Sequence, residues 1–193
     1  MSMDEIIIKL KACMKESRFK HSLGVMETSV ILARLYGADV KKAEIAGLIH
    51  DCARDIPVQT QLKMAENFGI LLDDIERLEP ALIHGPLGAA IARKDYGIED
   101  EEILNAVKLH TTGNENMTLL EKIIFLSDYI EPGRCFPGVE DLRVKAFKDL
   151  DEAMICAYDS TIRYVTEKGC FLHPRTVWAR NSILLHKGRE EKT

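Results

Sequence analysis

Hydrophobic residues recur along this chain with the period of an amphipathic α-helix, and no convincing stretch alternates with period two. The segment SLGVMETSVILARLYG places Val25, Thr28, Leu32 and Leu35 on one face. It is followed by Gly37, and glycine is the residue that most often ends a helix in the left-handed conformation. The pattern therefore predicts a helix that ends at Gly37.

Two further segments carry small or apolar residues at helical spacing and close with a histidine. In the first, Asp39 can cap a helix whose inner face holds Ala46, Gly47 and His50. The segment EILNAVKLHTTG repeats this arrangement, and its apolar stripe finishes at His110. Both patterns predict a helix whose last inward-facing residue is a histidine.

The second half of the chain is predicted to be helical as well. Thr118 and Glu121 form a candidate capping box at the start of TLLEKIIFLSDYIEPG. A long amphipathic stretch runs from about 140 to 168, and a last helix is expected over about 174–187, with Trp178 in the core. These patterns predict one all-α domain over residues 1–193, with about eight to ten helices.

Composition narrows the class of protein. The 193 residues are 46% hydrophobic, which suffices for a full core, and the net charge of −5 without a basic cluster argues against a nucleic-acid polymer as partner. Acidic residues before the first apolar run argue against a signal peptide, and no apolar run approaches the ~20 residues of a membrane span. Five cysteines without a CxxC motif predict reduced, mostly packed thiols of a cytoplasmic protein, with a zinc or catalytic cysteine as the alternative.

Residues with metal-ligand chemistry interrupt the apolar faces. His21, His50, His84 and His110 occupy inward positions, and Asp128 interrupts the run IIFLSDYI. Each residue alone is more readily explained as a core side chain bonded to a carbonyl or, for the aspartate, paired with an arginine. Together, on five predicted helices, they indicate imidazoles and carboxylates that converge in a bundle core, where metal sites of helical proteins are built.

The adjacent pair His50 and Asp51, in AGLIHDCARDIP, strengthens this interpretation. An unpaired buried charge costs several kcal/mol, and a divalent cation would neutralise Asp51 and keep the histidine as a neutral ligand. Because successive helix residues point about 100° apart, both can flank one ion only if the helix lies tangentially to it. Asp51 would then be free to bridge to a second ion or to a water.

The ordered set of His21, His50-Asp51 and Asp128 resembles the H…HD…D motif of the HD superfamily of metal-dependent phosphohydrolases. Within it, RFKHSLGVMETSVILARLYGAD, KAEIAGLIHDCARDIP, HGPLGA, LHTTG and SDYIEPGRCFPGVEDLR are similar to the YqeK family over nearly the whole chain. The resemblance implies a single-domain HD-type helical bundle. It also implies an enzyme that hydrolyses diadenosine tetraphosphate symmetrically to two ADP with a metal-activated water.

The resemblance further implies roles for individual residues. The metal, iron in this family, would be bound by His21, His50, Asp51 and Asp128. Catalysis would involve Asp51, His84 and His110, and the same three residues could hold a second metal. The last helix would pack near a nucleotide site lined by Arg18, His84, His110, Thr111, Arg134, Phe171, Leu172, His173, Pro174, Arg175 and Thr176.

The chemistry of these residues agrees with one group that binds the metal and another that binds the nucleotide. Nitrogen and oxygen donors without thiolate suit iron(II), manganese or another borderline cation, without choosing among them. Arg175 and Thr176 lie in the expected first turn of the last helix, where free amides favour an anion, and Arg134 in EPGRCFPG can bind phosphate bidentately. Phe171 or His173 can stack on a base. The alternatives are surface charges for the two arginines and a core position for Phe171.

Two other functions stay open at this point. One is an HD phosphohydrolase that acts on another nucleotide or on an alarmone. The other is a non-catalytic metal-binding module that senses a nucleotide. The sequence also leaves open the number of bound ions, the nucleoside preference and whether the chain forms a homodimer.

Overall fold

The structure, a computed structural model, describes residues 1–190. Within this range the chain forms eleven α-helices, one short 3₁₀-helix and no β-strand, which confirms the all-α prediction. The elements are α1 (Met3–Cys13), α2 (Glu16–Tyr36), α3 (Val40–Ile49), α4 (Val58–Asn67), α5 (Asp74–Leu78), η1 (Pro80–Leu82), α6 (His84–Tyr96), α7 (Glu101–Leu109), α8 (Leu119–Ile130), α9 (Val139–Ala146), α10 (Leu150–Glu167) and α11 (Pro174–Glu190).

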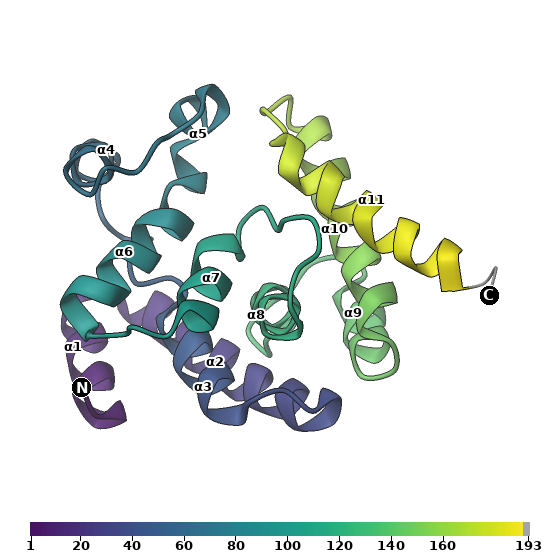
Figure 1. The fold of residues 1–193 in the computed structure, drawn as a ribbon, viewed down its shortest axis with the longest axis horizontal. Coiled ribbons are helices and arrows are strands. Elements are labelled where there is room, and N and C mark those ends of the chain that lie inside the picture. The colour runs from purple at the N-terminus through teal and green to yellow at the C-terminus, as the bar shows by residue number, and fades with distance from the viewer. Residues whose placement is uncertain (191–193) are drawn as a thin grey trace.

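Helix α8 lies at the centre of the arrangement (Figure 1). It contacts α2, α3 and α7 on one side and α9 and α10 on the other, and α11 packs along α10. Ile123, Ile124 and Leu126 of α8 are fully buried. The polar residues near the end of α8 are therefore held next to the ends of several other helices.

The predicted helix ends at three places are confirmed. Gly37 ends α2 in the left-handed region, with φ of +78°. Asp39 caps α3 by accepting hydrogen bonds from the amides of its first turn. Thr118 and Glu121 form the reciprocal capping box of α8. Each of these signals is local, because a cap is satisfied by side chains within a few residues of it.

The prediction of one long helix from about 140 to 168 is wrong. The stretch forms α9 and α10, and residues 147–149 separate them. Asp149 has an extended backbone, and its side chain accepts a hydrogen bond from the amide of Glu152, so it starts a new helix rather than continuing α9. This division and the five-residue α5 raise the helix number above the predicted eight to ten.

The predicted inner face of α2 needs one correction. Leu35 is 50% exposed, although Leu32 is fully buried. Tyr36, four residues after Leu32, takes the inward place, and its hydroxyl donates to the Ala146 carbonyl at 2.7 Å. On an α-helix, the fourth residue after Leu32 points more nearly in the same direction as Leu32 than the third residue does.

Two further burial predictions are wrong. Trp178 is 53% exposed, because the neighbouring Ala179 supplies the buried contact of α11. Cys13, Cys135 and Cys170 are exposed, so the cysteines are not mostly packed. A lone tryptophan or cysteine carries no periodic signal of its own, and its burial depends on which helix covers it.

Helices α2 and α3 approach each other closely at Gly47. A Cβ atom at this position would lie 2.5 Å from the Ser29 hydroxyl oxygen and 2.9 Å from the Met26 Cα. The Ser29 hydroxyl also donates to the Ala43 carbonyl at 2.9 Å, which ties the two helices together. This close contact brings His21 on α2 near the end of α3.

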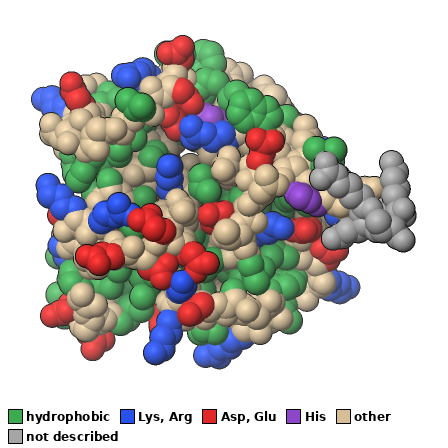
Figure 2. All heavy atoms as spheres, viewed as in Figure 1, with side chains coloured by type: hydrophobic (Ala, Val, Ile, Leu, Met, Phe, Trp, Pro, Cys, Tyr) green, Lys and Arg blue, Asp and Glu red, His purple; other side chains and the backbone are tan. Residues whose placement is uncertain are grey.

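Among residues 1–190, no helix combines the length and the apolar character needed to cross a membrane. On the face in Figure 2, acidic and basic side chains are interspersed, with hydrophobic side chains between them.

The close contact predicts that Gly47→Ala destabilises the fold. The added methyl group meets backbone atoms of α2, and overpacking of this kind costs about 1–3 kcal/mol. Urea unfolding measures the change. Gly188→Ala in α11 is the control, because nothing lies within 4 Å of the added atom there, and we expect no loss of stability. Equal stability of both variants and the wild type would contradict the packing argument.

Candidate metal centre

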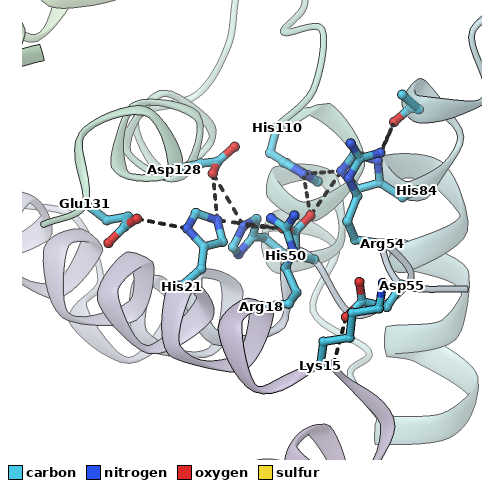
Figure 3. Close-up of polar contacts among 12 residues, drawn as sticks. Lys15, Arg18, His21, His50, Arg54, Asp55, His84, His110, Asp128 and Glu131 are labelled. Atoms are coloured by element: carbon cyan, nitrogen blue, oxygen red, sulfur yellow. Dashed lines mark hydrogen bonds and ion pairs between the residues drawn. The ribbon is translucent and has the colours of Figure 1, made fainter. Parts of the chain in front are cut away.

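Histidine and aspartate side chains from five parts of the fold meet at one buried point (Figure 3). They come from α2, from the residues that follow α3, from the start of α6, from the residue that follows α7, and from α8. Within each of three triads the potential ligand atoms lie within 4.8 Å of one another: His21–His50–Asp51, His50–His110–Asp128 and Asp51–His84–His110. The structure therefore brings together all the residues that the sequence singled out as candidate ligands.

His50 and Asp51 do not lie inside a helix, which corrects the sequence-based expectation. α3 ends at Ile49, and the following residues form turns in which Cys52 N–H donates to the Ile49 carbonyl and Arg54 N–H to the Asp51 carbonyl. Because the regular helix stops here, the fixed angle between successive side chains no longer applies. The two neighbours can both face the cluster.

Three histidines are held in the same way through Nδ1. In each, Nδ1 donates to the carbonyl three residues earlier, in the pairs His50–Gly47 at 2.8 Å, His84–Ala81 at 2.5 Å and His110–Val107 at 2.6 Å. A carbonyl oxygen only accepts, so Nδ1 carries a proton in each ring, and Nε2 keeps a lone pair wherever the ring is neutral. Each Nε2 faces the interior of the cluster.

His21 is held by a carboxylate instead. Its Nδ1 lies 3.1 Å from Oε1 of Glu131. This carboxylate is buried, and its Oε2 accepts from the amide of Gly133 at 2.6 Å. A Cβ at Gly24 would lie 2.6 Å from Glu131 Oε2, so the glycine makes room for this carboxylate. Sequence reasoning missed Glu131, because its place directly after α8, three residues after Asp128, is not by itself a signal of this role.

The inward nitrogen atoms of His21 and His50 lie close to a carboxylate oxygen. Nε2 of His21 lies 2.9 Å from Asp128 Oδ1, and Nε2 of His50 lies 3.8 Å from the same oxygen. Within the described residues neither buried Nε2 makes a hydrogen bond. Lone pairs and an anion at this distance repel one another unless a cation or a proton lies between them.

Asp51 lies between the His21–His50 side and the His84–His110 side of the cluster. Its Oδ2 lies 2.7 Å from Arg18 Nη1, 3.5 Å from His50 Nε2 and 3.7 Å from His21 Nε2. Its Oδ1 lies 3.1 Å from His84 Nε2 and 3.6 Å from His110 Nε2. One carboxylate can therefore interact with both groups at once.

The electrostatics favour ionised carboxylates and a neutral His50. Burial opposes ionisation of Asp51 and Asp128, but the neighbouring histidines and, for Asp128, Arg134 hold both pKa values below their ordinary range. Burial lowers the pKa of His50 to about 4, so its ring is neutral at pH 7 and its lone pair is free to bind a cation.

His84 and His110 form a pair of their own. Their Nε2 atoms are 3.0 Å apart, and one proton must lie between them for this contact to be a hydrogen bond. Burial lowers the pKa of His84. For His110 the effect of burial is outweighed, above all by Asp51, and the pKa is raised. The proton of the pair therefore belongs to His110.

The donor set fits a divalent metal ion. His21 and His50 offer buried nitrogen lone pairs, Asp51 and Asp128 offer ionised oxygens, and a cation among them removes the repulsion. The buried thiol of Cys52 adds no thiolate, because it donates to a carbonyl and burial raises its pKa. Mixed nitrogen and oxygen donors are typical of borderline cations.

The comparison with protein families agrees with this geometry. The HD domain family matches residues 18–133, a range that contains every histidine and aspartate of the cluster. The chain belongs to the HD domain family. The resemblance stated from the sequence is thus confirmed, and an HD domain implies a divalent metal ion at the cluster.

Relatives of this HD domain chain match it over nearly its full length. A protein of Halalkalibacterium halodurans named "Bis(5'-nucleosyl)-tetraphosphatase, symmetrical" is 43% identical and aligns over 92% of this chain and 95% of the relative. A protein of the same name from Bacillus subtilis is 39% identical, over 95% and 98%. A Clostridium acetobutylicum structure, described as a predicted HD superfamily hydrolase involved in NAD metabolism, has a TM-score of 0.94 and 47% identity, over 96% and 98%.

Two of the residues predicted to bind substrate are paired with carboxylates that are candidate metal ligands. Arg18 pairs with Asp51, and Arg134 pairs with the Asp128 carboxylate while its Nε donates to the Asp128 carbonyl at 2.7 Å. Thr111, which follows His110, lines a cavity together with Arg175. Arg18 and Arg134 therefore contact the candidate metal ligands directly, whereas Thr111 is a chain neighbour of one of the cluster histidines.

The segment 171–176 packs against α5. His173 is buried, with Nε2 2.8 Å from Asp73 Oδ2, and Arg175 Nη1 lies 3.1 Å from Glu76 Oε1. The Phe171 side chain is 55% exposed, so a core position for it is wrong. A base could stack on Phe171 as it stands, whereas stacking on His173 would require the segment to move.

The contact between His21 and Glu131 predicts a role for Glu131 in metal binding. Glu131→Gln keeps the shape of the side chain and an acceptor for Nδ1 but removes the charge that raises the basicity of the ring. We expect the affinity for a divalent metal to fall about 10- to 100-fold, measured by calorimetric titration of metal-free protein.

Glu27→Gln is the matched control, since Glu27 is an exposed carboxylate on α2, the helix that carries His21. It should bind metal as the wild type does. Wild-type affinity in Glu131→Gln would show that this carboxylate does not support the centre.

Proposed function

We propose that this protein is a metal-dependent hydrolase of dinucleoside polyphosphates that cleaves diadenosine tetraphosphate symmetrically to two ADP. The observation that carries the proposal is the group of His21, His50, Asp51 and Asp128, whose potential ligand atoms converge while the Nε2 atoms of both histidines have no hydrogen-bond partner among the described residues. It lies in a chain whose near-full-length relatives bear the name of symmetrical bis(5'-nucleosyl)-tetraphosphatases.

In this proposal His21 and His50 hold one metal ion through Nε2, and Asp51 and Asp128 hold it through their carboxylates. When bound, such an ion lowers the pKa of a water molecule and offsets the charge of the phosphates. The protein fixes the geometry beforehand, because Glu131 and the Gly47 carbonyl orient the two rings.

His84 and His110 contact the polyphosphate. Both rings face Asp51 Oδ1, and they share one proton at Nε2. A proton held there can form a hydrogen bond to a phosphate oxygen or pass to the leaving ADP. In phosphoryl transfer, positioning and charge compensation are the main tasks of the protein.

Arg18 and Arg134 stabilise the phosphates in the same proposal. Each arginine now pairs with a carboxylate that the metal ion would neutralise. Once the ion takes over this charge, the guanidinium groups can turn to phosphate oxygens, which they bind bidentately. Thr111 and the segment 171–176 would bind one nucleoside end, as the resemblance implies.

Two further proposals concern the identity of the metal and the location of the protein in the cell. We propose iron(II) as the native metal because the family resemblance implies it and the donors suit it, as they suit manganese. Metal analysis after anaerobic purification distinguishes the two. A cytoplasmic location rests on the resemblance, and the native mass in solution decides on the homodimer that the sequence leaves open.

The proposed reaction predicts a single product. Metal-loaded protein incubated with diadenosine tetraphosphate should yield two ADP per substrate, separated by ion-exchange chromatography. A chelator should abolish turnover, and added metal should restore it. AMP and ATP as products would contradict symmetric cleavage. Turnover of only another nucleotide or an alarmone would indicate a different HD phosphohydrolase, and tight nucleotide binding without turnover would indicate a sensing module.

Asp51 and His84 have different proposed roles, one as a metal ligand and one as a phosphate contact, so their substitution should have different effects. Asp51→Asn removes an anionic ligand, so metal affinity should fall more than about 100-fold, beyond the loss of a supporting residue. His84→Ala should keep the metal content of the wild type while kcat falls about 10²- to 10⁴-fold. Metal analysis and steady-state kinetics measure both effects. Loss of one of two metal equivalents in His84→Ala would instead make Asp51, His84 and His110 a second metal site.

A further inference from the structure

Helix α5 is held to the rest of the fold by a charged residue rather than by an apolar face. Its one buried residue is Glu76, which is 4% exposed, and the following η1 has no buried residue. A helix this short is not stable by itself, and helices in proteins are held mainly by the packing of an apolar face. The position of α5 and η1 therefore depends largely on polar contacts.

Two carboxylates tie α5 to the start of α11. Asp73 Oδ2 lies 2.8 Å from Nε2 of His173, and Glu76 Oε1 lies 3.1 Å from Nη1 of Arg175. We call these two pairs the α5 link. They join residues that are 100 and 99 positions apart in the chain, in two segments that face each other in Figure 1.

Each carboxylate of the α5 link uses its two oxygens for different partners. Asp73 Oδ1 accepts from the amide of Glu76 at 2.8 Å, and Glu76 Oε2 accepts from the amide of Asp73 at 3.0 Å, which closes the capping box of α5. The remaining oxygens contact His173 and Arg175. The side chains that cap α5 are therefore the same ones that hold it to α11.

The partners on the other side are ordered as well. His173 is 4% exposed, and its Nδ1 accepts from the amide of Arg175 at 3.1 Å, so Nε2 carries the proton that it donates to Asp73. Glu79, at the start of η1, accepts from the amide of Phe171 at 3.2 Å. The same segment of the chain therefore holds both α5 and η1.

The α5 link is satisfied without a metal ion. Potential ligand atoms of Asp73, Glu76 and His173 lie within 4.8 Å of one another. Both ring nitrogens of His173 already have partners, however, and Arg175 compensates the charge of Glu76. The contacts therefore indicate a structural connection rather than a second metal centre.

The position of η1 determines a contact in the metal centre. The Ala81 carbonyl in η1 accepts from Nδ1 of His84 at 2.5 Å, and Nε2 of His84 lies 3.1 Å from Asp51 Oδ1. The same carbonyl accepts from Arg54 at 3.2 Å. A displacement of η1 would therefore shift the ring of His84 relative to the cluster.

We propose that Asp73 and Glu76 are positioning residues: through the α5 link they hold η1 so that the Ala81 carbonyl orients His84 toward the phosphates. This inference rests on the proposed function, in which His84 contacts the polyphosphate. Neither carboxylate is a member of the three triads at the metal centre. The four proposed metal ligands come from α2, from the residues that follow α3 and from α8, so loss of the link should disturb His84 without loss of the metal.

Asp73→Asn and Glu76→Gln test the inference in the metal-loaded full chain. An amide side chain has a single acceptor oxygen, so it can cap α5 or contact α11 but cannot do both. We expect kcat for diadenosine tetraphosphate to fall about 10- to 100-fold in each variant, as for a reactive group displaced by about 1 Å. Metal content should equal that of the wild type.

Asp159→Asn is the matched control. Asp159 pairs with Arg180 and so ties α11 to α10, and its side chain is 43% exposed, as is that of Asp73. This variant loses a contact of the same helix α11 that does not involve α5. It should keep the kcat of the wild type.

A double substitution separates the positioning of His84 from a general structural effect. His84→Ala has no ring to position, so Asp73→Asn added to it should not lower kcat further. A further fall of the same size would overturn the inference, since the carboxylate would then act on another group. A rise in KM with unchanged kcat in the single variants would also overturn it, because the link would then serve substrate binding alone.

Nitrogen-15 NMR of the zinc-loaded full chain tests the inference independently of the reaction. The ring signals of His84 should shift in Asp73→Asn and in Glu76→Gln and stay unchanged in Asp159→Asn. Unchanged His84 signals in both link variants would overturn the inference even if diadenosine tetraphosphate is cleaved symmetrically. Shifted signals in a protein that does not cleave this substrate would support the positioning of His84 and contradict the proposed function.

Discussion

The structure depends on one electrostatic constraint: two ionised carboxylates are buried among imidazole rings whose lone pairs face them. Asp51 and Asp128 are held in the ionised form, and the inward Nε2 atoms of His21 and His50 have no hydrogen-bond partner among residues 1–190. Such a group is unfavourable by itself, since buried charges and polar atoms need compensation. A divalent cation at the centre satisfies every member of the group at once.

The fold keeps this arrangement in place by fixing the outer nitrogen of each ring. Backbone carbonyls hold three of the histidines. Glu131 holds His21, as Figure 3 shows. The carbonyls belong to the last turns of α3 and α7 and to η1, so the rings are oriented by secondary structure rather than by flexible side chains. Close contact of α2 with α3, and the central place of α8, bring these helix ends together. Preorganised ligands reduce the cost of binding both metal and substrate.

The sequence predicted the candidate ligands because each lies at an inward position of a helical pattern, and the family resemblance gave them an order. It could not predict that His50 and Asp51 follow a helix end, since no glycine or proline stands between Ile49 and Asp51. Glu131 was missed because a carboxylate just before a proline is usually a solvated residue, and only the three-dimensional contact with His21 distinguishes it. The pairing of Arg134 with Asp128, and the cavity that both line, also depend on tertiary contacts that no local pattern encodes.

Nitrogen-15 NMR of the histidine rings in metal-free protein tests the central claim most directly. The account predicts a proton on Nδ1 and a bare Nε2 in His50, whose pKa is lowered by burial, and a large shift of the Nε2 signals of both His21 and His50 when zinc is added as a diamagnetic probe. His173 is an internal reference for the opposite tautomer, because its Nδ1 accepts from the amide of Arg175 and its Nε2 donates to Asp73. A proton on Nε2 of His50, or Nε2 signals of His21 and His50 that do not respond to zinc, would contradict the account.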